Sequence, residues 1–173
     1  NFDLEKKKKN TINFIIGGSN KYFKFNEETQ NKIFNDIEYL SKISQVNVIP
    51  SRRTPHQFIK NLSMLNNLNV KLFTNLFDPI TYGNLLSESN MQIVTWDSIS
   101  MISEAISSET GTFLYEFEEE SCPKRYQLFH QMVKQKGFLK SFSRNMRPYT
   151  VSMSAYNSEL KSKILNKIES NLW

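Results

Sequence analysis

Short apolar runs alternate with amphipathic segments along this chain. The runs lie at residues 11–16, 46–49, 70–73, 91–95 and 112–117. Apolar runs this short are typical of strands buried on both faces of a parallel sheet. Between them, apolar residues recur at helical spacing, as Ile33, Ile37 and Leu40 do. The alternation predicts an α/β fold, a Rossmann-like three-layer sandwich with a mostly parallel sheet of five to six strands.

Several helix ends can be read from local sequence. Asn26 and Asp78 are expected N-caps, the first followed by two glutamates and the second by a proline. Thr54-Pro55-His56-Gln57 fits a capping box with proline at the first helical position. Gly137 is expected to end a helix that begins near Pro123. A last helix is predicted over residues 158–171.

A glycine turn follows the first predicted strand. Such sheets bind ligands outside the carboxyl ends of their strands, so the strand ends are where a site is expected. Gly17 and Gly18 allow the backbone to approach a ligand closely. Exposed N–H groups, with Ser19 and Lys21, could hold a phosphate. The alternative is an ordinary turn from strand to loop.

Two further strand ends carry candidate phosphate ligands. Ser51, Arg52 and Arg53 precede a helix, and arginine offers a bidentate fork suited to phosphate. After the fourth strand come candidates on a hydroxyl-rich helix start: Asp97, Ser98, Ser100, Met101 and Glu104. A carboxylate one turn into this helix could accept hydrogen bonds from ribose hydroxyls. The alternatives are surface arginines and an exposed, capped helix face. Together the three stretches predict one nucleotide diphosphate site.

Composition and charge limit which other classes of protein this chain could belong to. The chain has 173 residues and a net charge of +5, with much of the excess in Lys6–Lys9. We interpret residues 1–10 as a solvated linker and residues 11–173 as one domain. No aromatic-and-basic motif accompanies the lysines, so nucleic acid is not an expected partner. No apolar run approaches the ~20 residues that span a bilayer. We expect a cytoplasmic location, with peripheral contact to an inner membrane left open.

Metal and cofactor sites are not expected. His56, His130 and the single Cys122 are too widely separated in sequence to suggest a zinc site. An acidic stretch, Glu116 with residues 118–120, could hold a divalent cation, but a solvated loop is the simpler interpretation. Each histidine is also explained by packing or capping.

Separated motifs in the same order resemble one known family. They are IIGGSNKYFKFNEE, PSRRTP, TWDSISMISEA, TGTFLYEF and KRYQLFHQMVKQKGF. The chain resembles, over residues 11–150, the family named for the plant mitochondrial-fission factor "elongated mitochondria", whose many bacterial members are regarded as glycosyltransferase-like. The resemblance implies the C-terminal, donor-binding domain of a GT-B glycosyltransferase, paired with an N-terminal domain of the same protein. One departure is Gly111-Thr112-Phe113, where the family usually has glycine–lysine–proline.

The resemblance implies roles for the candidate residues. The donor substrate would be a nucleotide-diphosphate sugar, used without a bound metal. Its phosphates would lie near the glycine turn and the arginines, and Glu104 would bind the ribose. The basic stretch Lys124, Arg125 and His130 would lie near the cleft. The catalytic residues, the sugar and the acceptor are not identified by the resemblance.

Two other functions are weighed. The plant relative's role in organelle fission suggests an adaptor that keeps the fold without the chemistry. A Rossmann oxidoreductase is disfavoured, because Gly17-Gly18 lacks the remaining glycine spacing and no acid ends the second strand.

Overall fold

One parallel sheet organises the chain. The computed structural model describes residues 10–67, 69–74, 78–117 and 122–153. Within them, six strands follow the order β3-β2-β1-β4-β5-β6, and every neighbouring pair is parallel. The strands are β1 (Thr11–Ile16), β2 (Gln45–Pro50), β3 (Val70–Leu72), β4 (Met91–Thr95), β5 (Thr112–Tyr115) and β6 (Leu139–Ser141). The helices are α1 (Glu27–Ser41), α2 (His56–Leu62), η1 (Ser63–Asn67, 3-10), α3 (Pro79–Glu88), α4 (Ile99–Ser107) and α5 (Lys124–Gln135). The predicted α/β class is confirmed.

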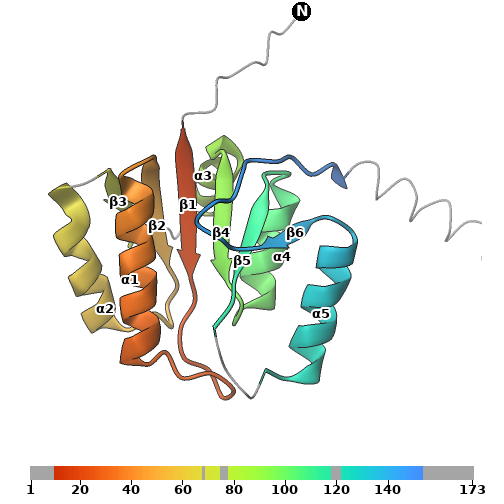
Figure 1. The fold of residues 1–173 in the computed structure, drawn as a ribbon, viewed down its shortest axis with the longest axis horizontal. Coiled ribbons are helices and arrows are strands. Elements are labelled where there is room, and N and C mark those ends of the chain that lie inside the picture. Colours follow the sequence, from red (N-terminus) through yellow and green to blue (C-terminus); the bar gives the residue numbers. More distant parts are fainter. Residues whose placement is uncertain (1–9, 68, 75–77, 118–121, 154–173) are drawn as a thin grey trace, which may run out of the picture.

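The sheet is the middle of three layers. In Figure 1, α1 and α2 cover one face, α3 and α4 cover the other, and α5 lies at the β6 end. Buried polar contacts tie both faces to their helices. The Asn13 amide of β1 donates to the Leu85 carbonyl of α3 at 2.7 Å. The Tyr115 hydroxyl of β5 donates to Asp36 of α1 at 2.6 Å.

The strand order reverses beside β1. The chain runs outward from β1 through β2 to β3, then returns to start β4 on the other side of β1. At such a switch point the loops after the flanking strands diverge and leave a crevice at the carboxyl edge. The loops after β1, β2 and β4 meet at this edge, which is the lower one in Figure 1.

Most predicted helix ends are confirmed, and one is wrong. The side chains of Asn26 and Asp78 accept from backbone N–H groups of α1 and α3, and Gly137 has a φ of 75° after α5. The capping box at Thr54 does not form, since α2 begins after Pro55 without a side-chain cap. The Thr54 hydroxyl donates to the carbonyls of Ile16 and Gly17 instead. Three residues of edge strand β6 carry too little pattern to have been predicted.

The segment at residues 142–151, after β6, crosses back over the sheet. Arg144 pairs with Asp36 of α1 at 2.7 Å. The Tyr149 hydroxyl donates to the Thr112 carbonyl of β5 at 2.6 Å. A Cβ at Gly111 would overlap the Tyr149 backbone carbonyl, so glycine is needed there for close packing. The segment is therefore part of the packed domain.

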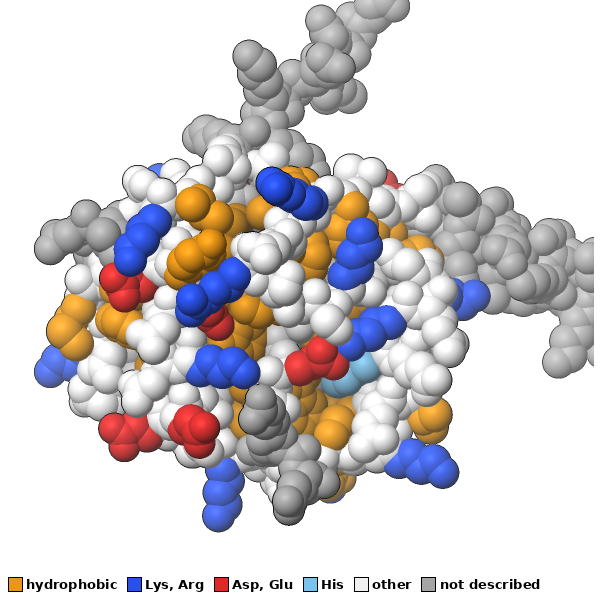
Figure 2. Space-filling model, in the orientation of Figure 1, with side chains coloured by type: hydrophobic (Ala, Val, Ile, Leu, Met, Phe, Trp, Pro, Cys, Tyr) orange, Lys and Arg blue, Asp and Glu red, His pale blue; other side chains and the backbone are white. Residues whose placement is uncertain are grey.

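Three sequence predictions lie wholly or largely outside the described residues: the helix at 158–171, nearly all of the linker at 1–10 and the acidic stretch at 118–120. In the described part of the chain, no helix has the length and apolar character needed to cross a membrane. On the face shown in Figure 2, basic and acidic side chains are interspersed rather than gathered into one basic surface.

Candidate functional site

Asp97 is the centre of a buried polar cluster at the switch point. Its carboxylate accepts from the Gly18 N–H at 3.1 Å and from the Thr95 hydroxyl at 2.7 Å. Arg53 completes it with an ion pair of 2.9 Å. The Asp97 side chain is 0% exposed and that of Arg53 is 37% exposed. We call Gly17, Gly18, Arg53, Thr95 and Asp97 the switch-point hub.

The glycine turn is shaped by the hub itself. The Gly17 N–H donates to the Thr95 hydroxyl at 2.8 Å. A Cβ at Gly17 would overlap the Asp97 carboxylate, and a Cβ at Gly18 would overlap the Arg53 carbonyl. Glycine is required here for contact with protein atoms, whatever ligand lies beyond. The three predicted stretches are thus brought together by direct contacts.

Arg53 is engaged by protein groups. Besides Asp97, its guanidinium donates to the carbonyls of Gly18 at 2.9 Å and Ser19 at 3.4 Å. It therefore joins the loop after β2 to the loops after β1 and β4. These contacts leave fewer of its N–H groups for a phosphate than the sequence alone suggested.

Arg52 lies in a different environment from its neighbour. It is exposed and lines a cleft of about 800 Å³ at the carboxyl ends of β1 and β2. We call this the β2–α4 cleft. Its lining residues are Ile15, Ile49, Pro50, Ser51, Arg52, Thr54, His56, Ile59, Thr74, Tyr82, Met101 and Glu104. The cleft combines apolar residues, such as Ile15, Ile49 and Ile59, with polar and charged side chains that could orient a small molecule.

Tyr82 of α3 is a cleft residue that the sequence did not indicate. Its hydroxyl donates to Glu104 Oε2 at 3.3 Å, across from α3 to α4. Burial and the Glu104 carboxylate raise the pKa of Tyr82, so the hydroxyl stays protonated and remains a donor. One carboxylate oxygen of Glu104 is thereby held, and the other is left for a ligand.

The remaining predicted residues lie around the same edge. Ser98 precedes α4 without a side-chain cap, and its hydroxyl lies 3.3 Å from that of Ser100. The Ser19 hydroxyl accepts from the Phe25 N–H at 3.0 Å. Lys21 and Arg125 both lie over the Tyr22 ring. Lys124 is an exposed first residue of α5. Lys21, Lys124 and Arg125 do not line the β2–α4 cleft.

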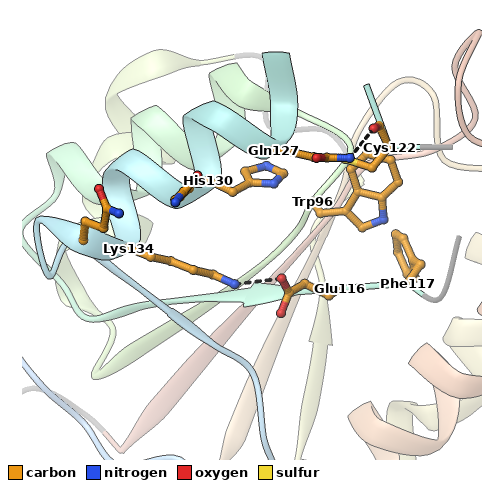
Figure 3. A pocket seen from close by; sticks show the side chains of 9 residues that line it. Trp96, Glu116, Phe117, Cys122, Gln127, His130 and Lys134 are labelled. Atoms are coloured by element: carbon orange, nitrogen blue, oxygen red, sulfur yellow. Dashed lines mark hydrogen bonds and ion pairs between the residues drawn. The ribbon is translucent and has the colours of Figure 1, made fainter. Parts of the chain in front are cut away.

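His130 belongs to a second cavity. This α5 cavity, of about 400 Å³, lies between α5 and the ends of β4 and β5 (Figure 3). Its lining residues are Trp96, Glu116, Phe117, Cys122, Gln127, His130, Gln131, Lys134 and Gln135. Lys134 pairs with Glu116 at 2.7 Å, as the dashed line in Figure 3 marks. Within the described ranges, no group of three His, Cys, Asp or Glu side chains could hold a metal ion.

The site residues that the sequence did not indicate were missed for one common reason. Thr54, Thr95 and Tyr82 act through partners that are remote in sequence or belong to the backbone. The position of Thr95 at the last residue of β4, the edge where such sheets bind ligands, could have marked it as a candidate. No local signal joins Tyr82 to Glu104, because their contact depends on how α3 and α4 pack.

Comparison with known proteins identifies the family. The model of the family described as "Mitochondrial fission ELM1" matches residues 1–164. A protein of Rickettsia prowazekii (strain Madrid E), "Uncharacterized protein RP120", is 36% identical over 134 residues. That match covers 70% of this chain and 36% of the relative, so the chain spans about a third of the relative's length. The chain belongs to the mitochondrial fission ELM1 family.

Proposed function

We propose that the β2–α4 cleft binds the nucleotide part of a nucleotide-diphosphate sugar. The observation that carries the proposal is the convergence of Ser51 and Arg52 with Glu104 on one cleft at the switch point. A cation, a hydroxyl and a carboxylate beside apolar residues suit a nucleotide, which has an anionic end, a diol and a flat apolar base.

Each group has a natural partner in such a ligand. The Arg52 guanidinium would pair with phosphate oxygens in a charge-assisted hydrogen bond. The free oxygen of Glu104, held in place by Tyr82, would accept from a ribose hydroxyl. Ile15, Ile49 and Met101 would pack against the base. Arg53 and Asp97 would act one step away, by holding the loops that form the cleft wall.

The whole protein is proposed to be a metal-independent glycosyltransferase. The diphosphate leaving group would be stabilised electrostatically, by Arg52 and backbone N–H groups fixed before the reaction. The binding site for the acceptor and a catalytic base would come from the rest of the protein, since this chain corresponds to about a third of its relative. A non-catalytic adaptor of the fission-factor type is the alternative, which the family name favours.

Calorimetric titration with UDP, GDP, ADP and CMP tests the proposal. We expect saturable binding of at least one nucleotide, lost in the Arg52→Ala/Glu104→Ala double variant. Lys60→Ala is the matched control, because Lys60 is an exposed cation on α2 outside the cleft. Absence of binding at millimolar concentration to every nucleotide would reject the proposal and favour the adaptor.

A further inference from the structure

Two side chains that line the α5 cavity each carry a buried nitrogen for which no described residue supplies a hydrogen-bond partner. The two nitrogens are Trp96 Nε1 and His130 Nε2, on side chains that are 4% and 7% exposed. Buried polar atoms are almost always hydrogen-bonded in native proteins. Two unpaired nitrogens on side chains that line one small cavity point to a ligand that supplies the partners.

The protonation states of the two side chains define what that ligand must offer. An indole nitrogen can only donate. Burial lowers the pKa of His130, so its ring is neutral near pH 7, and its hydrogen bond with the Trp96 backbone leaves Nε2 as the acceptor. The ligand therefore needs one acceptor for Trp96 and one donor for His130. Hydroxyl groups provide both.

The other described walls of the cavity favour an uncharged ligand. Glu116 and Lys134 pair with each other, and Lys134 also donates to Ser141 at 2.8 Å. Among the described lining residues, Glu116 and Lys134 carry opposite charges and pair with each other, and Gln127 and Gln131 add neutral amides. Phe117 adds an apolar ring, which stacks on Phe23 at 4.6 Å. Aromatic walls with amides and a carboxylate suit a ring that has apolar faces and hydroxyl edges.

We propose that the α5 cavity binds an uncharged hydroxylated ring of monosaccharide size. The cavity shares no lining residue with the β2–α4 cleft among the residues that the structure describes. The inference therefore does not require that the cleft binds a nucleotide. The ring could be a free or glycan-linked sugar, or the sugar of a nucleotide donor, and both present the same hydroxyl chemistry.

The test uses the full chain and methyl glycosides of glucose, galactose and N-acetylglucosamine. The chain has two tryptophans, so Trp173→Phe leaves Trp96 as a local fluorescent reporter beside the calorimetry. We expect saturable binding of a glycoside with a change in Trp96 emission. Each of two variants keeps an aromatic ring: Trp96→Phe removes the indole nitrogen, and His130→Phe removes both imidazole nitrogens, including Nε2. Each should weaken binding roughly threefold to tenfold, the effect of one neutral hydrogen bond.

Leu128→Ala is the matched control, because Leu128 is 55% exposed on the same helix and does not line the cavity. Competition by UDP-sugars, but not by UDP, would identify the sugar as the donor's, whereas simultaneous binding would identify a separate one. Absence of saturation with every glycoside and UDP-sugar would overturn the proposal, as would unchanged affinity in both folded cavity variants. Binding of UDP alone would then leave only the nucleotide proposal standing.

Discussion

The switch-point hub and the β2–α4 cleft lie at one edge of the sheet and use their polar groups in opposite ways. In the hub, the Asp97 carboxylate is buried and accepts from Gly18, Thr95 and Arg53. In the cleft, Glu104 is exposed and accepts a hydrogen bond from the Tyr82 hydroxyl. The hub is built to hold three loops together, and the cleft leaves its groups available to a ligand.

Two adjacent arginines show the same division. Arg53 turns inward to Asp97 and to the carbonyls of Gly18 and Ser19. Arg52 lines the cleft. Identical side chains one residue apart are thus expected to affect different properties, stability for Arg53 and ligand affinity for Arg52.

The largest expected effect comes from removing the centre of the hub. Asp97→Ala leaves a buried N–H and hydroxyl without an acceptor and removes the partner of Arg53. We expect the free energy of unfolding to fall by about 3 kcal/mol in urea denaturation followed by circular dichroism. Glu104→Ala should change it by less than about 0.5 kcal/mol, because that carboxylate is exposed. Equal losses of unfolding free energy in the two variants would contradict the distinction between hub and cleft.

Substitution of two glycines, one in the hub and one outside it, tests how tightly the hub is packed. Gly17→Ala forces a Cβ into the Asp97 carboxylate and should destabilise the domain by about 2 kcal/mol. Gly83→Ala is the control, since a Cβ there meets no atom within 4 Å. In the interior of α3, this change should stabilise by about 0.5 kcal/mol. Thermal unfolding measures both, and a tolerated Gly17→Ala would mean that the loop relaxes freely.

Substitution of the two arginines is expected to separate effects on domain stability from effects on nucleotide affinity. Arg53→Ala should lower the free energy of unfolding by about 1 kcal/mol, because half-exposed Arg53 is partly hydrated already. Arg52→Ala should leave stability unchanged and weaken nucleotide-diphosphate binding about tenfold, the loss of one charge-assisted contact. Calorimetry measures the affinity and thermal unfolding measures the stability of the same samples. Lys60→Ala is the control, for which we expect no change in either. The reverse assignment would show that Arg53 leaves the hub to bind phosphate.

The smallest effect concerns the Tyr82–Glu104 contact. Tyr82→Phe frees the Glu104 carboxylate while keeping the ring in the cleft. We expect roughly threefold weaker binding of a ribonucleotide and little change for its 2′-deoxy analogue, because only the ribose hydroxyl would use Glu104. Similar losses for both nucleotides would indicate that Tyr82 supports the base or the fold instead.

The strands were predictable because burial on both faces leaves a continuous apolar run. Local capping at Asn26 and Asp78 was predictable for a different reason, because donor and acceptor are close in sequence. The Thr54 capping box failed because the carbonyls of Ile16 and Gly17 compete for the same hydroxyl. The sequence located the edge of the sheet that carries the candidate site. It could not show that Arg53 turns inward while Arg52 lines the cleft, because Arg53 pairs with a carboxylate more than forty residues away.

The segment at 142–151 determines where this domain can be cut. A fragment that stops at the last residue of the sheet, Ser141, would retain every strand and lose the Arg144 partner of buried Asp36. It would also uncover the end of β5 where Tyr149 binds Thr112. Any shortened version for expression or crystallisation should therefore extend at least through Val151, whose N–H donates to the Glu109 carbonyl at 3.1 Å.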